Sequence, residues 1–307
     1  MTDVRAAGAF WDREIIERTH ASWMDEPLVR ASIDEMIGGA VPMPQGDWFV
    51  SRLNGRTFDR GLSIGCGVGN LEREAIRRNV CKSMDAFDGS VHSLHLARTA
   101  AVRDSYGDRI RYFASDFNRP ALPRDTYDIV FFNQSLHHVG KLEKLYRAIL
   151  LAMKSDAVLY LDEYIGPSRT EWSDALIAPH RAVFASLPAE VRKTDFLPLP
   201  IQADDPSEAI RSGEIMKQLT IGFEIEAMRN YGGNLLAVLH PLIDWSHAPS
   251  DLLPRLIEQD RVMASRGSYY ALVIARPSRG LRKLYARVRW WLEPKMKRVL
   301  RAITKRA

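Results

Sequence analysis

A glycine-rich turn is the first part of the sequence with the residue types and spacing for chemistry. Gly65, Gly67 and Gly69 follow a short apolar run, with Cys66 between the first two, and helical spacing begins directly after them. Glycine permits a tight strand-to-helix turn and a close approach of a ligand to the backbone. The G-x-G-x-G spacing differs from the G-x-G-x-x-G of dinucleotide sites. It indicates either another nucleoside site or a tight turn without a ligand.

An acidic residue ends the second predicted strand. Asp88, followed by Gly89, lies 19 residues after Gly69. A carboxylate at this strand tip can accept hydrogen bonds from both hydroxyls of a ribose. Asp85 competes for the role, but it lies inside the strand and should not reach the same ligand edge. Asp88 is therefore preferred, and a solvated strand-end carboxylate is the structural alternative.

Polar residues also follow the third and fourth predicted strands, at 110–113 and 127–132. A carboxylate after the third strand can accept from an adenine amine while an aromatic ring packs on the base, although Asp116 could instead only start a turn. Residues after the fourth strand lie at the carboxyl edge of the sheet, where ligands bind in open α/β folds. The candidates for cofactor contact here are Ser115, Asp116, Phe117, Asn133 and Gln134.

An α/β sheet is needed to bring these turns together. Apolar strand runs alternate with segments of helical spacing, which predicts parallel βαβ units with right-handed crossovers. The run at 127–132, YDIVFF, is nearly continuous and predicts a strand buried on both faces. The predicted strands are 61–64, 82–87, 110–113, 127–132 and 157–164, with two later ones at 223–229 and 269–275 that suit a hairpin-like addition.

The chain divides into three regions. Residues 1–54 are expected to form an N-terminal helical lid, in which Phe10, Trp11 and Trp23 either cover the cofactor or simply pack. Residues 55–278 form the α/β domain, with a Pro-rich, mostly helical cap inserted at about 166–213. Residues 279–307 form a basic tail.

The basic tail carries most of the positive charge. It contains eleven Lys or Arg residues and one acid, a balance of +10 against +5 for the whole chain. Apolar residues recur every three or four positions through 281–303, which predicts an amphipathic helix that Pro294 should kink or split. Such a helix could lie on anionic lipid, dock on its own domain, or meet another anionic partner such as nucleic acid.

Composition is that of an ordinary soluble protein, at 46% hydrophobic and 26% charged residues. The sequence predicts neither a signal peptide nor a membrane-spanning helix. Two cysteines give no disulfide framework, so a cytoplasmic protein is expected, with the tail on the inner face of the membrane if it binds lipid. No third ligand accompanies His92 and His95, so no metal is expected. The oligomeric state is not predicted.

Four blocks together resemble the class I S-adenosylmethionine-dependent methyltransferases: GLSIGCGVGNLE, FDGSVHSLHLAR, ASDF and YDIVFFNQSLHHV. The resemblance covers about residues 55–165. It implies a Rossmann-like, doubly wound seven-stranded sheet of order 3-2-1-4-5-7-6 with an antiparallel last strand, and S-adenosylmethionine as the cofactor. Residues 161–169, LDEYIGPSR, further resemble methyltransferases associated with polysaccharide biosynthesis.

Methyl transfer to a hydroxyl needs a group that accepts the departing proton. His137 and His138 follow the fourth strand, and histidine titrates near neutral pH. Neighbouring helical residues point about 100° apart, so only one should face the pocket, and His138 is preferred. Glu163 and Tyr164, at the tip of the fifth strand, could orient the acceptor. In the alternative interpretation all four residues pack or cap.

These expectations favour O-methylation of a sugar or glycan-linked hydroxyl. The alternatives are methylation of a lipid or another small metabolite, and a non-catalytic nucleoside-binding protein of the same fold. A nucleic-acid amine is disfavoured because NQSLHH lacks the Pro-Pro-aromatic signature of amino-methylating enzymes.

Overall fold

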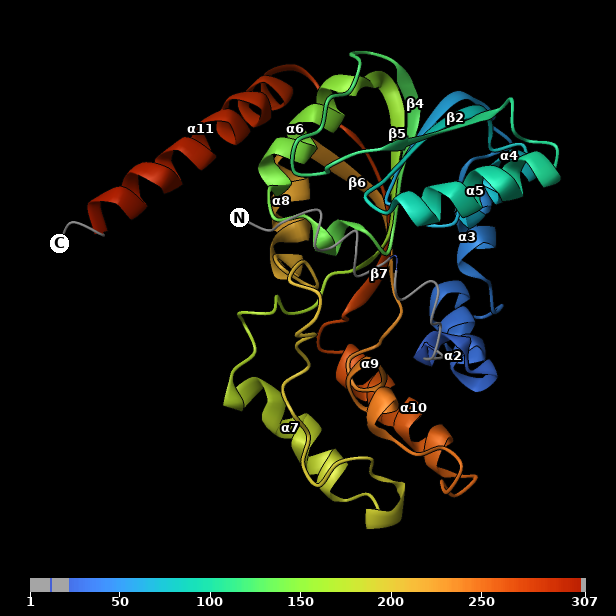
Figure 1. Ribbon diagram of the computed structural model, residues 1–307, viewed down its shortest axis with the longest axis vertical. Coiled ribbons are helices and arrows are strands. Elements are labelled where there is room, and N and C mark those ends of the chain that lie inside the picture. The colour runs from blue at the N-terminus through green and yellow to red at the C-terminus, as the bar shows by residue number, and fades with distance from the viewer. Residues whose placement is uncertain (1–11, 13–21, 305–307) are drawn as a thin grey trace.

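A seven-stranded sheet forms the centre of the protein (Figure 1). The computed structural model describes residue 12 and residues 22–304. The strand order is β3-β2-β1-β4-β5-β7-β6, and β7 runs antiparallel to both of its neighbours. The predicted order and the antiparallel last strand are therefore confirmed. The strands are β1 (Phe58–Ile64), β2 (Cys81–Asp88), β3 (Ile110–Ala114), β4 (Tyr127–Asn133), β5 (Met153–Tyr164), β6 (Phe223–Asn230) and β7 (Tyr270–Pro277).

Helices cover both faces of this sheet. Figure 1 shows α3, α4 and α5 on one side, α6, α8 and α11 on the other, and α7, α9 and α10 grouped beyond one end of the strands. Their bounds are α2 (Pro27–Gly38), α3 (Gln45–Arg52), α4 (Asn70–Arg77), α5 (Val91–Arg103), α6 (Leu142–Ala152), α7 (Asp174–Ala185), α8 (Ile215–Gly222), α9 (Leu236–Leu239), α10 (Leu252–Ala264) and α11 (Gly280–Thr304). Short 3-10 turns are η1 (Trp23–Asp25), η2 (Leu136–His138), η3 (Ala189–Val191), η4 (Ser212–Glu214) and η5 (His240–Leu242).

Strand β4 is buried on both of its faces. Ile129 and Phe131 belong to the hydrophobic cluster on the α3 and α4 side, whereas Val130 and Phe132 belong to the cluster beneath α6. Successive side chains of a strand point to opposite faces, so a strand covered on both faces needs apolar residues at every position. The prediction of a doubly buried strand is confirmed.

Two strands begin earlier than the sequence pattern indicated. β1 starts at Phe58, which pairs with Cys81, and β5 starts at Met153, which pairs with Tyr127. Polar residues follow Phe58 and Met153 and interrupt the apolar pattern, although both of these first side chains are buried in the core. Helices α8 and α10 were not predicted from the sequence.

The cap is described throughout, whereas the lid is described only in part. Residues 166–213 contain α7, η3 and a long irregular segment between β5 and α8. Trp23 is buried, with its ring centroid 5.4 Å from that of Tyr270. Phe10 and Trp11 lie outside the described residues, so the role of the lid remains a prediction.

Candidate active site

The glycine-rich turn connects β1 to α4 and is built from left-handed residues. Gly65, Gly67 and Gly69 have φ values of 78°, 51° and 77°. A Cβ atom on Gly65 would collide with the side chain of Ser135, whereas one on Gly67 would meet nothing within 4 Å. Gly65 is therefore required by the packing of β1 against the turn after β4. Gly67 instead presents open backbone, as a bound ligand requires.

Asp88 closes this turn from the tip of β2. Its carboxylate accepts from the backbone N–H of Gly67 and of Ser90, each at 2.8 Å. Burial raises the pKa of Asp88, and these two hydrogen bonds act in the opposite direction. The strand-end carboxylate is thus held against the open glycine backbone, with Gly89 beside it.

Asp85 has a different environment. It is buried within β2, where it forms ion pairs of 2.7 Å with Arg60 and with Arg111. It also accepts from the Tyr127 hydroxyl at 2.9 Å. These partners occupy the carboxylate within the sheet, which agrees with the preference for Asp88.

The turn after β3 lies next to Asp88. Ser115 donates its backbone N–H to the Asp88 carbonyl at 2.9 Å. Asp116 accepts from the Asn118 N–H at 2.8 Å, so one of its oxygens starts the turn, as the structural alternative predicted. Phe117 packs at the edge of the cluster beneath α6.

Asn133 ends β4, and Gln134 follows it. A cavity of about 290 Å³ lies between α3 and α4, and Asn133 and Asp162 help to line it. The Gln134 side chain donates to Asp162 and to the Tyr231 hydroxyl, at 3.2 and 3.1 Å. Burial raises the pKa of Asp162 to about 6, against the hydrogen bond from Tyr231. Gln134 therefore points towards the β5 and β7 side of the sheet. Asp162 and Tyr231 were not identified from the sequence.

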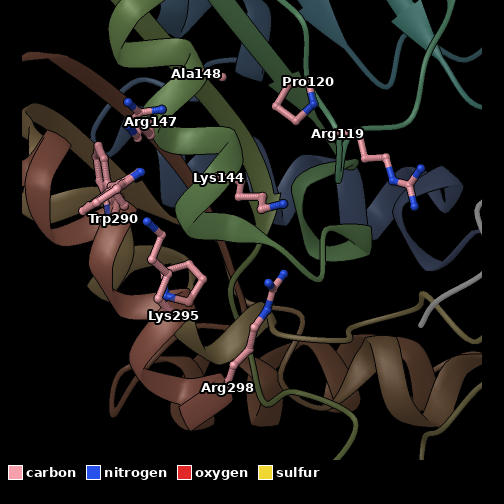
Figure 2. Close-up of a pocket in the computed structure, with 10 residues that line it drawn as sticks. Arg119, Pro120, Lys144, Arg147, Ala148, Trp290, Lys295 and Arg298 are labelled. Atoms are coloured by element: carbon pink, nitrogen blue, oxygen red, sulfur yellow. The ribbon is translucent and has the colours of Figure 1, made fainter.

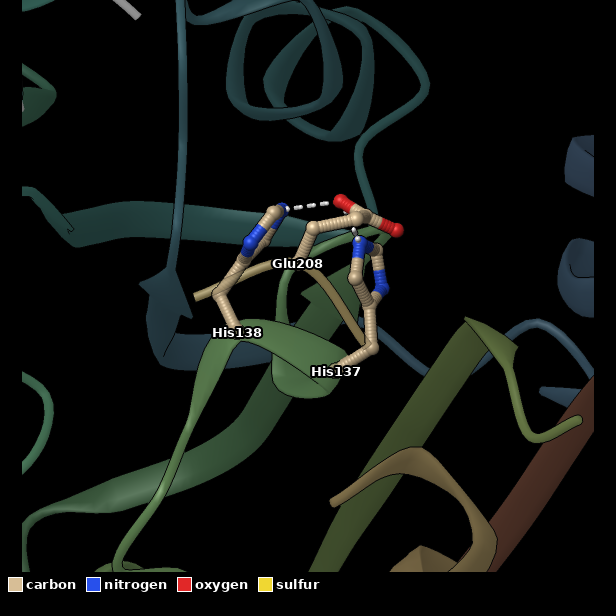
Figure 3. A group of neighbouring side chains, drawn as sticks. All are labelled: His137, His138 and Glu208. Carbon is tan, nitrogen blue, oxygen red and sulfur yellow. Dashed lines mark ion pairs between the residues drawn. The ribbon is translucent and has the colours of Figure 1, made fainter. Parts of the chain in front are cut away.

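The two histidines lie on η2 and face a carboxylate from the cap. Nε2 of His137 and Nε2 of His138 each lie 3.6 Å from the Glu208 carboxylate, as Figure 3 shows. The two ring centroids are 4.1 Å apart. On their other sides, His137 Nδ1 contacts Glu163, and His138 Nδ1 lies 3.1 Å from Ser207 Oγ and 3.5 Å from Asp205.

Opposite protonation states result from this arrangement. Burial opposes the charged form of His137, yet the carboxylates of Glu163 and Glu208 raise its pKa to about 10. Burial and the adjacent His137 cation lower the pKa of His138 to about 4, against Glu208 and Asp205. At neutral pH the pair therefore consists of one imidazolium and one neutral imidazole. The neutral imidazole of His138 is the form that a proton acceptor requires.

Glu163 and Tyr164 occupy distinct places at the end of β5. Glu163 is fully buried and accepts from the backbone N–H groups of Ser135 and Leu136, at 2.9 and 2.6 Å. It therefore contacts the η2 turn and His137. Tyr164 lies between His137 and a group of aromatic rings. The centroid of the Tyr164 ring is 6.1 Å from that of His137 and 5.2 Å from that of Tyr270.

Sequence reasoning missed the cap contribution to this site. Asp205, Ser207 and Glu208 come from an irregular segment with no periodicity, about seventy residues after the histidines. Asp205 accepts from the Ser207 backbone at 2.7 Å, which forms a local turn. The acidic, Pro-containing string DDPSEA was the only local signal.

His137, His138 and Glu208 also meet the distance requirement for a shared ion. One ligand atom from each lies within 4.8 Å of the others. The metal expectation from the sequence concerned His92 and His95 and did not consider this group.

Comparison with known proteins identifies the domain. A family model described as a methyltransferase domain matches residues 47–192, which contain the glycine-rich turn, Asp88 and the histidine pair. Residues 47–192 therefore match a methyltransferase domain. The cofactor is S-adenosylmethionine, and the residues around Gly67 and Asp88 fit a nucleoside because they combine open backbone with a buried acceptor.

Curated relatives of this methyltransferase domain include fungal sterol 24-C-methyltransferases. The Neurospora crassa protein is 26% identical over 104 residues, 34% of this chain and 27% of that protein. The Saccharomyces cerevisiae protein is 23% identical over 176 residues, 57% of this chain and 42% of that protein. The chain thus matches less than half the length of either relative.

Solved structures share the fold of this chain. Geranyl diphosphate C-methyltransferase from Streptomyces coelicolor superposes with a TM-score of 0.55 at 14% identity, over 90% of this chain and 97% of that one. The cyclase SpnF superposes with a TM-score of 0.50 at 16% identity, also over 90% and 97%. At these identities the likeness concerns the fold alone.

A pair of glycine variants should separate folding from cofactor binding. Gly65→Ala should lower the free energy of unfolding by more than about 2 kcal/mol, because a clash adds to the left-handed strain. Gly67→Ala should cost only about 1 kcal/mol from that strain but weaken S-adenosylmethionine binding at least about tenfold. Thermal denaturation and calorimetric titration measure the two effects. Equal binding by Gly67→Ala and wild type would remove Gly67 from the cofactor site.

Proposed function

We propose that this protein transfers the methyl group of S-adenosylmethionine to a small-molecule acceptor that loses a proton during the reaction. The observation that carries the proposal is the buried pair of His137 and His138 after β4, each with its Nε2 atom 3.6 Å from the Glu208 carboxylate, because burial and the adjacent His137 lower the pKa of His138 and favour its neutral form. A site for an acceptor without a departing proton would not need such a base.

The cofactor side follows from the turns at the ends of β1 to β4. S-adenosylmethionine supplies a methyl group that its sulfonium already activates, so the protein must mainly align donor and acceptor. In the proposal Asp88 accepts from the ribose hydroxyls, while Asp116 and Phe117 receive the adenine. The remaining contacts would come from Gly65, Cys66, Gly67, Gly69, Gly89, Ser115, Asn133 and Gln134.

On the acceptor side, His138 is proposed as the catalytic base. Glu208, 3.6 Å from its Nε2, would stabilise the imidazolium that forms when the proton arrives. His137, already cationic, would hold Glu208 from the other side. Glu163 is a positioning residue because it fixes His137 and the η2 backbone, and Tyr164 would orient the acceptor through the neighbouring rings.

A lipid-type acceptor is the favoured chemistry. The curated relatives are named for sterols and the solved neighbour for geranyl diphosphate. Tyr164, Tyr269, Tyr270 and Trp172 form a chain of ring contacts beginning 6.1 Å from His137. Such rings suit an apolar skeleton. A sugar or glycan-linked hydroxyl, as in polysaccharide biosynthesis, rests only on the sequence resemblance and is the second candidate.

Transfer of a labelled methyl group tests the activity directly. The protein is incubated with methyl-labelled S-adenosylmethionine and either isoprenoid and sterol lipids or nucleotide sugars. Label should appear in the lipid fraction and disappear in Asp88→Ala, whose cofactor binding is weakened. Label in the sugar fraction alone would contradict the lipid acceptor and favour a sugar hydroxyl as the acceptor. Cofactor binding without transfer to any crude cell extract would favour the non-catalytic alternative.

His138→Ala should lower kcat at least about 100-fold, the usual contribution of a positioned base. Its affinity for S-adenosylmethionine should stay within about twofold of wild type, because His138 lies on the acceptor side. His95→Ala, an exposed histidine of α5, is the matched control and should retain full turnover. Full turnover by His138→Ala would rule out the base. Turnover that chelators abolish and divalent cations restore would assign the cluster to a metal.

The profile of kcat/KM against pH should not show the fall near pH 6.5 that the protonation of an ordinary histidine causes. His138 is the acceptor only when neutral, and its pKa of about 4 keeps it neutral above that pH. Groups facing it are His137, Glu208, Asp205 and, behind His137, Glu163. We expect kcat/KM to vary less than about twofold between about pH 6 and pH 8, then to fall below about pH 5. A limb centred near 6.5 would contradict the protonation states described.

A further inference from the structure

Helix α11 is anchored to the domain by one face. Ala286 and Trp290 are buried, and the Trp290 ring stacks on Tyr146 at 5.8 Å between centroids. Trp290 also donates to Gln218 at 3.1 Å, and a Cβ atom on Gly222 would collide with its ring. Docking on its own domain, one of the alternatives from the sequence, therefore accounts for this face. The helix runs through Pro294 without being divided.

The opposite face of α11 is apolar and exposed. At 100° per residue, seven apolar side chains fall within one arc opposite Ala286 and Trp290. Their exposed fractions range from 39% to 85%, so nothing in the described part of the chain covers them. We call this the outer stripe; it consists of Leu281, Leu284, Tyr285, Val288, Trp291, Leu292 and Met296.

A basic groove of about 530 Å³ lies beside the outer stripe, between α6 and α11 (Figure 2). No acidic residue lines it within the described chain. The Arg147 guanidinium has a buried Nε without a hydrogen-bond partner there, and Lys295 Nζ lies 3.1 Å from the centroid of the Trp291 ring. The groove is lined chiefly by Arg119, Lys144, Arg147, Trp291, Lys295 and Arg298.

We propose that the outer stripe and the basic groove together dock the protein on an anionic phospholipid bilayer, independently of the methyl transfer proposed above. The stripe would enter the boundary between headgroups and acyl chains, and the groove would receive a lipid phosphate. Apolar residues flanked by cations, with a tryptophan between them, match the requirements of an interfacial helix. Figure 1 shows α11 extending away from the domain, where a surface could reach it.

Two other partners, a nucleic acid and a second copy of the chain, would each match only part of the surface formed by the outer stripe and the basic groove. A nucleic-acid backbone would pair with the cations but leave the apolar stripe in water. A second copy of the chain would bury the stripe but bring two rows of cations together. Among residues 22–304 no helix is long and apolar enough to cross a bilayer.

Sedimentation with vesicles tests the proposal on the full chain. Wild type should partition at least about tenfold more strongly into vesicles of 70% phosphatidylcholine and 30% phosphatidylglycerol than into pure phosphatidylcholine. Val288→Ser with Trp291→Ser, which alters the stripe, and Arg147→Gln with Arg298→Gln, which alters the groove, should each weaken this binding at least about tenfold.

Lys82→Gln with Arg103→Gln is the matched control, because it removes two exposed cations from β2 and α5. It should bind vesicles within about twofold of wild type. S-adenosylmethionine binding by every variant reports an intact domain. Equal vesicle binding by all variants would overturn the proposal, as would binding to duplex DNA that is stronger than to vesicles and insensitive to the stripe variant.

Discussion

Four hydrogen-bond donors meet at the buried carboxylate of Glu163: the backbone N–H groups of Ser135, Leu136 and Tyr164, and the His137 imidazole. A buried carboxylate is tolerated only when its hydrogen bonds are satisfied. Here the donors come from the ends of two neighbouring strands, so the register of β4 against β5 fixes the η2 turn. The orientation of both histidines, and hence of Glu208, depends on that register.

Local patterns in the sequence predict the residues proposed for the cofactor but not all of those proposed for the acceptor. The strands, the glycine turn and Asp88 carry local signals, because glycine spacing and strand periodicity are set by neighbours in the chain. The order of the strands in the sheet came instead from the resemblance to a known family. Glu208 and Asp205 meet the histidines only through the cap, and an irregular segment leaves no periodic signal of where it folds. Glu163 could be picked out as a strand-tip acid, but its backbone contacts could not, because they depend on strand register.

Negative and positive charges gather in different parts of this protein: carboxylates at the candidate site and cations on α11. The carboxylates of the site are matched locally, as with Glu208, whose pKa the His137 imidazolium lowers to about 2 against the effect of burial. Three cations of α11 also have carboxylate partners: Lys297 lies 3.1 Å from Glu143, Arg282 lies 3.6 Å from Glu224 and Arg289 lies 3.7 Å from Glu293. Arg298 and Lys295 instead line the basic groove, where no acidic residue of the described chain lies. The helix therefore keeps a positive field along the part that points away from the sheet.

The residues proposed for the donor all precede residue 135, whereas those proposed for the acceptor, apart from the histidines, follow residue 162. The cap is a single insertion between β5 and α8, and one residue of it, Ile210, donates its backbone N–H to the His137 carbonyl at 3.1 Å. Exchange of residues 166–213 between relatives would thus leave the donor half unaltered. In the proposal, rewriting this one contiguous stretch of the gene would replace Trp172 and Glu208 on the acceptor side, while the rings of Tyr164, Tyr269 and Tyr270 would stay in place.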